Sequence, residues 1–315
     1  MPLYEVLIVG GGPSGLSAAL VLGRCRRSVL ICDEGEPRNK ASRAIHGFLT
    51  RDGTPPAEFR QAAHEQMVRY ANVEFRALKV QSITREGEHF EATLSDGTSV
   101  QSRTILLATG VKDQLPEVTG IQLFYGQGVF HCPYCDGWEH QDMPLAAYGN
   151  GEAAFDLACE LLRWSGDVTL CCKDPLELTP EQRTKLDILK VRVISSALTA
   201  VGAHGGPKLE LLRFADGSEQ PCRALFFVTE VCEPSPLIEA TGCPVKVDGS
   251  VETSDPKIDE ASGVYVAGNV RCGLHLVIVA SGQGTEAAFH INEDLQQAEL
   301  DSRWGEAGAF AKSSQ

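Results

Sequence analysis

The chain has 315 residues, and its 42 acidic and 28 basic side chains give a formal net charge of −14. This length predicts two domains, and a composition of 43% hydrophobic and 22% charged residues excludes a disordered or fibrous protein. The acidic balance argues against nucleic acid or an anionic membrane as the main partner, because both repel a negative surface. No apolar run approaches a membrane span and no signal segment is evident, so we expect a soluble, cytoplasmic protein.

The first 33 residues carry the pattern of a dinucleotide-binding unit. A strand-like run at 4–9 leads into a glycine-rich turn at 10–15, an apolar-periodic helix and a second strand at 29–33. Gly10 permits the tight turn, Gly12 lets the backbone approach a pyrophosphate, and Gly15 lets helix and strand pack closely. The helix N-terminus offers free N–H groups to the phosphates, and Asp33 is placed to accept hydrogen bonds from an adenosine ribose.

The same unit recurs 139 residues later. Sliding the first motif places Gly10 on Gly149 and Gly12 on Gly151, followed by a predicted helix at 155–164 and a strand at 168–172. Cys172 stands where the first copy has its acid. The second copy is therefore either a working nucleotide site or a relic whose glycines serve packing alone.

Two further strands, near 104–110 and 263–269, are expected to complete the first domain, with a helix from about 276 to 295 after the second. The fold class is α/β, with two Rossmann-like domains of the three-layer ββα type and the second inserted into the first. We expect crossings near 115–120 and 242–251, where Gly and Pro gather. The predicted segments are 1–117 and 247–300 for the first domain, 118–246 for the inserted domain that carries the dithiol, and 301–315 for a loosely held tail.

Cys132 and Cys135 are two thiols separated by two residues on the first turn of a predicted helix. Such a pair forms a disulfide or shares a metal, but zinc needs two more ligands at a second short spacing and none occurs. No metal site is expected, and a pair of buried structural thiols remains as the plain alternative to a redox dithiol. Asp136 follows the second sulfur and is placed to exchange a proton with a thiol, or to cap the helix.

In this order and spacing, the motifs at 10–15, 108–110, 132–136, 149–154 and 268–269 resemble the low-molecular-weight thioredoxin reductases over nearly the whole chain. The resemblance implies FAD in the first domain, a homodimer, and a domain rotation. It implies that Cys135 faces the flavin, that Cys132 attacks the substrate disulfide, and that Asp136 is the acid/base. The residues expected at the cofactor are Gly10, Gly12, Pro13, Ser14, Gly15, Asp33, Ala108, Thr109, Gly110, Gly268, Asn269, His275 and Leu276.

The second nucleotide motif departs from that family. Where the family has an Arg cluster for the 2′-phosphate of NADPH, the sequence at 171–175 offers only Lys173, and a single Lys does not reproduce an Arg fork. The strand at 226–230 also ends without the expected glycine turn, which makes the use of NADPH doubtful. Asn269 replaces an Asp, and His275-Leu276 replace the usual Arg-Gln; His275 either approaches the flavin or caps a helix.

These departures resemble a side branch that includes FAD-dependent dithiol oxidases of the gliotoxin and holomycin type. The main prediction is a reductase-like thiol–disulfide oxidoreductase, whose partner is a thioredoxin-like protein or a small disulfide or dithiol and whose donor is NADPH, NADH, ferredoxin or a dithiol. The alternative is a dithiol oxidase that passes electrons to oxygen. The side branch also suggests a tail aromatic, Trp304 or Phe310, over the flavin, and His46 as a base has no support beyond its position.

Overall fold

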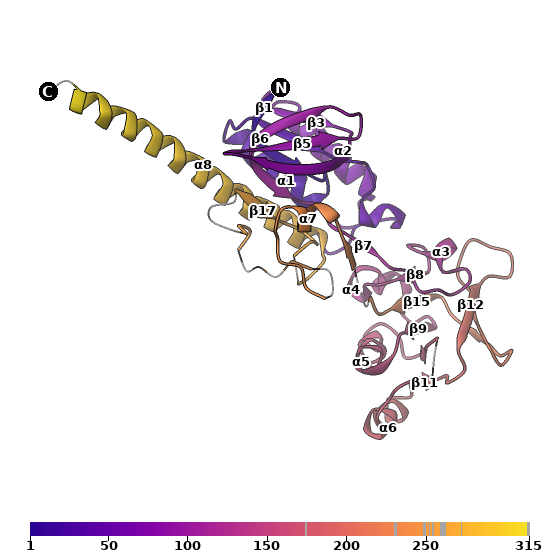
Figure 1. Ribbon diagram of the computed structural model, residues 1–315. Helices are drawn as coiled ribbons and strands as arrows, with labels where there is room; N and C mark the ends of the chain where they lie inside the picture. Colours follow the sequence, from indigo (N-terminus) through magenta and orange to yellow (C-terminus); the bar gives the residue numbers. More distant parts are fainter. Residues whose placement is uncertain are drawn as a thin grey trace. The chain divides into compact units, whose positions relative to one another are not determined.

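Figure 1 shows the chain as a computed structural model, which describes residues 1–173, 175–229, 232–247, 250–251, 253, 255–258, 263–271 and 273–313. The chain divides into two compact units. The first comprises Met1–Arg38, Ala57–Lys112 and Cys232–Gln315, and the second comprises Asn39–Pro56 and Asp113–Val231. The predicted order, with one Rossmann-like unit inserted into another, is confirmed.

The first unit is built on a seven-stranded sheet in which β17 lies beside β6 and the remaining order is β3-β2-β1-β6-β5-β4. Strands β1, β2, β3, β6 and β17 are parallel, and β4 and β5 extend the sheet antiparallel. The strands are β1 Leu3–Val9, β2 Val29–Cys32, β3 Val73–Arg76, β4 Val80–Glu86, β5 His89–Leu94, β6 Ser99–Leu107 and β17 Val264–Val266.

Alternation along β1 shows why this unit has three layers. Val6 and Ile8 point to one face and pack with α1 and α8, whereas Leu7 and Val9 point to the other and pack with residues of β4, β5 and α7. The helices of this unit are α1 Pro13–Arg24, α2 Pro56–Met67, α7 Pro236–Ala240 and α8 Val277–Ser313. The 3₁₀ turn η1 Arg38–Ala41 begins at the last residue of its first segment.

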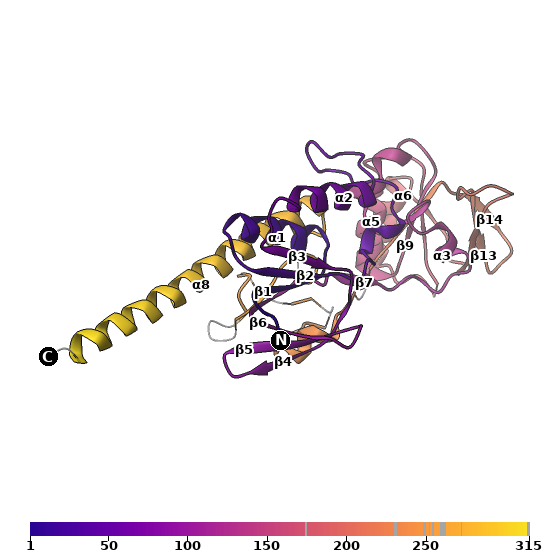
Figure 2. The same cartoon turned by 90° about the horizontal axis from the view of Figure 1, so that it is seen from above.

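The last helix is longer than expected. We expected it to end near residue 295 and to be followed by a loose tail, but α8 continues to Ser313 and extends past the sheet of its unit (Figures 1 and 2). No proline interrupts the sequence after residue 276, so the backbone can continue its helical hydrogen bonds. Trp304 lies on this helix with 83% of its surface exposed, and the side chain of Phe310 lies outside the described residues.

The second unit repeats the architecture with a five-stranded parallel sheet of order β11-β10-β9-β15-β8. Helices α5 and α6 cover one face, and the antiparallel β12-β13-β14 sheet covers the other. The strands are β8 Val129–Phe130, β9 Leu145–Tyr148, β10 Val168–Cys171, β11 Arg192–Val193, β12 Leu198–Gly202, β13 Leu211–Phe214, β14 Glu219–Pro221 and β15 Ala224–Phe227. The helices are α3 Ile121–Phe124, α4 Pro133–Asp136, α5 Gly151–Leu161 and α6 Pro180–Ile188, with the 3₁₀ turn η2 Trp138–His140.

The connections between the units differ from those expected from Gly and Pro content. They run through β7 Val111–Asp113 and β16 Cys232–Pro234, which pair with each other as a small two-stranded sheet. The return therefore lies before the predicted 242–251. In addition, residues 39–56 join the second unit, although they interrupt the first in sequence. Pairing between segments more than a hundred residues apart is a tertiary property that local composition does not record.

Candidate active site

Eleven of the thirteen expected cofactor residues follow strand ends that lie in one row. Register pairs Cys32 with Val9, Val9 with Leu107, and Leu107 with Val266, so four parallel strands end together. The segments after these ends therefore meet at the carboxyl edge of one sheet, where open α/β sheets bind ligands. They contain Gly10, Gly12, Pro13, Ser14, Gly15, Asp33, Ala108, Thr109, Gly110, Gly268 and Asn269.

The glycines of the first motif differ in what surrounds them. A Cβ on Gly15 would lie 1.9 Å from the Gly10 carbonyl oxygen, and one on Gly10 would lie 2.4 Å from the Ala108 carbonyl oxygen, so both sites are closed by the protein itself. A Cβ on Gly12 would meet nothing within 4 Å. Gly12 has an ordinary backbone conformation, with φ −75° at the N-cap of α1. The missing side chain at Gly12 therefore leaves room for a ligand beside the helix N-terminus.

Asp33 lies at the end of β2, as predicted, but it is already engaged. Its carboxylate accepts a hydrogen bond from Arg60 Nη2 on α2 and another, of 3.3 Å, from the backbone N–H of Gly35. Arg60 was not found by sequence reasoning, because nothing local connects α2 with the acid after β2. A carboxylate has about four lone-pair sites, so these bonds still allow it to accept from a ribose hydroxyl.

The third and fourth strand ends supply polar groups and a close helix contact. The hydroxyl oxygen of Thr109 is shielded from solvent and has no hydrogen-bond partner within the described part of the chain. Gly268, with φ +84°, donates its N–H to Gln283 Oε1 on α8 at 2.9 Å, and a Cβ there would lie 2.5 Å from the Ser14 hydroxyl. Asn269 is half-buried directly after it. A buried hydroxyl of this kind normally has a partner, so Thr109 is suited to contact a bound group.

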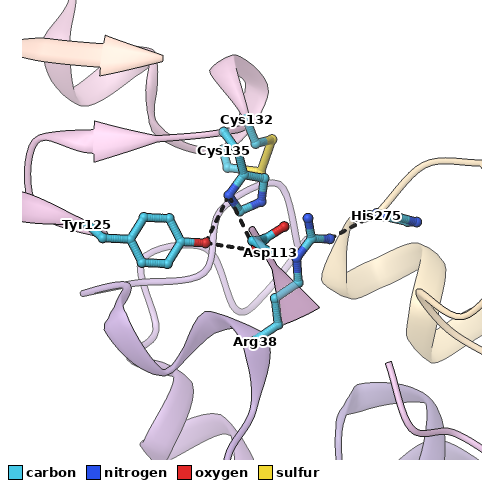
Figure 3. The surroundings of a disulfide bond; sticks show 7 residues. Arg38, Asp113, Tyr125, Cys132, Cys135 and His275 are labelled. Atoms are coloured by element: carbon cyan, nitrogen blue, oxygen red, sulfur yellow. Dashed lines mark hydrogen bonds and ion pairs between the residues drawn. A yellow bond between two sulfur atoms is a disulfide. The ribbon is translucent and has the colours of Figure 1, made fainter. Parts of the chain in front are cut away.

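His275 lies two residues before α8 and pairs with a residue of the same unit. Its Nδ1 is 2.9 Å from Nη1 of Arg38, and Figure 3 draws this contact. Because a guanidinium only donates, Nδ1 accepts and the ring carries its proton on Nε2. Leu276 begins the helix, since its carbonyl accepts from the N–H of Ala280 at 2.9 Å. The residues of the first unit thus fit a dinucleotide cofactor: an open glycine at a helix N-terminus, an acid at the second strand and a buried hydroxyl.

The dithiol lies in the second unit, directly after β8. Cys132 and Cys135 form a disulfide with their Cα atoms 5.3 Å apart, and Cys132 is the N-cap residue of α4. The helix is a single turn of four residues, so it aligns few peptide dipoles and its N-terminal field is weak. Cys132 and Cys135 are half-buried, and Tyr134 and Trp138 around this turn are 71% and 68% exposed, so the disulfide lies at a partly accessible, apolar part of the surface.

Asp136 is the last residue of α4 and directly follows Cys135 in the chain. The pKa of its carboxyl is raised to about 7, mainly by burial and also by the negative charge of Glu139, while His46 acts in the opposite direction. The backbone oxygen of Asp136 accepts from His140 Nδ1 at 2.8 Å, so that imidazole is turned to the main chain. A carboxyl that titrates near neutral pH can both give and take a proton under cellular conditions.

A polar cluster that sequence reasoning missed also belongs to the surroundings of the disulfide (Figure 3). The hydroxyl of Tyr125 donates to Asp113 Oδ2 at 2.7 Å, and His131 Nδ1 lies 3.2 Å from the same hydroxyl and 3.9 Å from the same carboxylate. The side chain of Asp113 is only 3% exposed. His131 directly precedes Cys132, which was a signal in the sequence, but Asp113 and Tyr125 come from other elements and no spacing links them.

In the second glycine motif, the side chain of Asn150 caps the N-terminus of α5. Asn150 Oδ1 accepts from the N–H of Gly151 at 2.9 Å and from the N–H of Glu177 at 2.7 Å, so this side chain covers the N-terminus of α5 and ties it to the loop after β10. Cys172, at the ribose position, is buried with 1% of its surface exposed, and Lys173 is engaged by Glu117 at 2.8 Å. Asp174 and Glu230, which belong to the departures noted in the sequence, lie outside the described residues. Asn is a favoured N-cap residue, and that preference was readable in the sequence.

Comparison with known proteins gives consistent matches. Residues 4–284 match the family described as pyridine nucleotide-disulphide oxidoreductase. The chain is 42% identical over 171 residues to a protein of Arthroderma benhamiae named "Probable thioredoxin reductase", an alignment that spans 52% of this chain and 42% of that protein. It is 30% identical to thioredoxin reductase tcpT of Claviceps purpurea over 85% of this chain and 86% of that protein. The crystal structure of HlmI superposes with a TM-score of 0.91 at 33% identity, over 98% of this chain and 97% of that one.

The sequence resemblance, the paired Rossmann-like units and these matches agree. None of the helices within the described residues has the length and apolar character needed to cross a bilayer. The chain belongs to the pyridine nucleotide-disulphide oxidoreductase family, as an atypical thioredoxin reductase-like disulfide oxidoreductase.

Proposed function

We propose that the protein is an FAD-dependent enzyme that passes electrons between flavin and the Cys132–Cys135 dithiol, and from there to or from a disulfide substrate. The observation that carries this proposal is the accessible disulfide next to a carboxyl whose pKa is about 7. A structural disulfide needs neither exposure nor a neighbouring acid that titrates at neutral pH. FAD, when bound, supplies the two-electron redox chemistry.

The first unit would hold that FAD. Gly12 and the N-terminus of α1, with Pro13 at its first turn, would face the pyrophosphate, and Asp33 would accept from the adenosine ribose. Thr109, Asn269 and His275 would hold the remaining part of the cofactor through hydrogen bonds. Gly10, Gly15 and Gly268 would act indirectly, because their missing side chains let strand and helix approach each other.

The dithiol would act in the following order. The thiolate of Cys132 attacks one sulfur of the substrate disulfide, and the second substrate sulfur leaves and takes up a proton. Cys135 then attacks Cys132, which re-forms the Cys132–Cys135 bond and releases the first substrate sulfur as a thiol. Two electrons pass from the dithiol to the substrate, and Asp136 exchanges the proton of Cys135. The substrate is a thioredoxin-like protein or a small disulfide.

The second glycine motif bears on whether the enzyme uses a nicotinamide donor. Asn150 already accepts from the N–H of Gly151 at the start of α5 and from the N–H of Glu177, and Lys173 is paired with Glu117. Binding of NADPH at this helix N-terminus would have to compete with these contacts. This observation favours a second candidate function, a dithiol oxidase. In that function a substrate dithiol reduces the Cys132–Cys135 disulfide, and the electrons pass through flavin to oxygen.

Anaerobic mixing separates these functions. Purified yellow protein is mixed with NADPH, NADH or dithiothreitol, and the visible absorbance of the flavin is followed. Bleaching by NADPH supports the reductase; bleaching only by dithiothreitol, with recovery in air, supports the oxidase. Bleaching by neither points to ferredoxin or another protein as the donor. In every case Cys135→Ser should abolish disulfide turnover, and full turnover in that variant would refute the dithiol function.

We also propose that the enzyme is a homodimer. Four large apolar residues of α8 are exposed and spaced 11, 11 and 4 residues apart, namely Ile278, Phe289, Leu300 and Trp304. Eleven residues make just over three helical turns, so these side chains form one stripe that a second copy of the helix could cover. A mass determination in solution tests this assembly.

The location we propose is the cytoplasm. Seven cysteines of the described chain are free thiols, and five of them are buried. Burial raises the pKa of Cys32 to about 11, which keeps that thiol protonated and inert. Free thiols in these numbers are typical of a protein from a reducing compartment.

A further inference from the structure

Residues 39–56 belong to the second unit, and they contain a closed loop at 45–54. The N–H of Ile45 donates to the carbonyl of Thr54 and the N–H of Gly53 donates to the carbonyl of Ile45, both at 2.8 Å. Ile45 is buried, with 4% of its surface exposed. Within the loop, the N–H of Gly47 donates to Asp52 Oδ1 at 2.8 Å. A compact loop closed by its own hydrogen bonds holds its side chains in fixed positions.

His46 is the side chain that this loop presents to the dithiol segment. Its Nδ1 lies 3.5 Å from Asp52 Oδ1 within the loop, and its Nε2 lies 3.5 Å from Glu139 Oε1, four residues after Cys135. The imidazole is 21% exposed, whereas the two carboxylates are 66% and 39% exposed. The imidazole therefore lies between a carboxylate of its own loop and a carboxylate of the dithiol segment. The loop brings a basic side chain to the segment that carries Asp136.

We propose that His46 is a positioning residue that, together with Glu139, sets the charge of Asp136 and so controls proton transfer at the dithiol. This inference rests on the proposed function, in which Asp136 handles the proton of Cys135. It assigns a role to loop 45–54, whose His46 lies 86 residues before Cys132 in the sequence.

The electrostatic surroundings of Asp136 support this role. Burial is the main reason why the pKa of its carboxyl is about 7; Glu139 raises it and His46 lowers it. The other charged or titratable neighbours are Asp52, which faces His46, and His140, whose ring bonds the backbone oxygen of Asp136. Removing the imidazole of His46 and removing the carboxylate of Glu139 should therefore shift the titration of Asp136 in opposite directions. A merely structural contribution of either residue would not produce opposite signs.

The experiment compares His46→Gln and Glu139→Gln in the flavin-loaded enzyme. The first readout is the pH dependence of disulfide reduction by dithiothreitol, followed anaerobically by flavin bleaching. The second is the infrared band of the protonated Asp136 carboxyl, identified by its loss in Asp136→Asn and titrated directly. His204→Gln is the matched control, because it removes an exposed histidine of the same unit at the turn between β12 and β13.

His46→Gln should raise the pKa of Asp136, and Glu139→Gln should lower it, each by about half a unit to one unit, as expected for a screened interaction between partly exposed charges. The pH profile should move with the infrared titration, and His204→Gln should leave both unchanged. Unmoved titrations in both variants, or shifts of the same sign, would overturn the inference. Full turnover in Cys135→Ser would instead overturn the proposed function, so the two failures can be told apart.

Discussion

Two glycines three positions apart in the first motif should respond oppositely to the same added methyl group. In Gly12→Ala the new Cβ meets no protein atom within 4 Å, and φ −75° suits alanine. In Gly15→Ala the new Cβ would lie 1.9 Å from the Gly10 carbonyl oxygen, well inside the contact distance of carbon and oxygen. The first change should leave the polypeptide intact, and the second should force α1 away from β1.

The magnitudes follow from these contacts. Gly15→Ala should lower the free energy of unfolding by about 1–3 kcal/mol, the usual cost of overpacking. Gly12→Ala should not destabilise the chain and could stabilise it by a few tenths of a kcal/mol, because alanine restricts the unfolded state. If FAD lies against Gly12, the methyl group would displace the pyrophosphate from the helix N-terminus. Loss of one or two charge-assisted hydrogen bonds should then weaken FAD binding by about 2 kcal/mol, roughly thirtyfold.

Thermal unfolding with and without excess FAD measures both effects, because a ligand that binds only the folded state raises Tm by an amount that grows with the logarithm of its concentration over Kd. Gly12→Ala should show the wild-type Tm without added FAD and a much smaller rise with it, together with low flavin content as purified. Gly15→Ala should show a lower Tm in both conditions. Wild-type flavin affinity in Gly12→Ala would refute the placement of the pyrophosphate, and an unchanged Tm in Gly15→Ala would refute the packing argument.

Two further predictions concern stability. Because the pKa of Asp136 rises from 3.8 to about 7 on folding, the unfolded chain loses this proton first, so stability falls as pH rises through that window. Above about pH 7, Asp136→Asn should therefore have a higher free energy of unfolding than the wild type, by up to about 4 kcal/mol. Near pH 4 the difference should be much smaller, and denaturant titrations at the two pH values measure it. Arg27 is 9% exposed and donates to Glu5 at 2.7 Å and to Glu299 of α8, so Arg27→Met should cost about 2–3 kcal/mol in the same assay. Arg192, which forms an ion pair with Asp167 at the surface, is the control for Arg27. A loss of stability in Arg192→Met equal to that in Arg27→Met would contradict the role of burial.

The local elements of the cofactor unit were predictable from the sequence. The strand at 4–9, the turn at Gly10 and the acid after the second strand were placed correctly, because a buried parallel strand, a tight turn and a helix start each have their own residue pattern. Errors arose where the pattern was weaker. The helix of the second glycine motif, α5, begins at Gly151 rather than at 155, since Asn150 caps it. The last helix, α8, continues well beyond residue 295.

The partners of the site residues could not be predicted in the same way. Asp33 with Arg60, and Tyr125 with Asp113, are pairs between separate elements. Nothing in the spacing of either pair encodes the contact, because it depends on how helices and strands pack. Likewise, the crossing strands β7 and β16 pair across more than a hundred residues, where glycine and proline content gave a different boundary.

The sequence by itself determined the chemistry that the protein carries: two glycine motifs 139 residues apart, one Cys-x-x-Cys-Asp and an acidic chain. These features depend on residue type and short spacing, which the linear sequence contains in full. Only the tertiary structure decided which groups act on one another. It placed loop 45–54 beside Glu139, buried Asp136 enough to raise its pKa to about 7, and closed the second glycine motif with Asn150. Burial and charge proximity arise from packing between distant segments, so they exist only once the chain has folded.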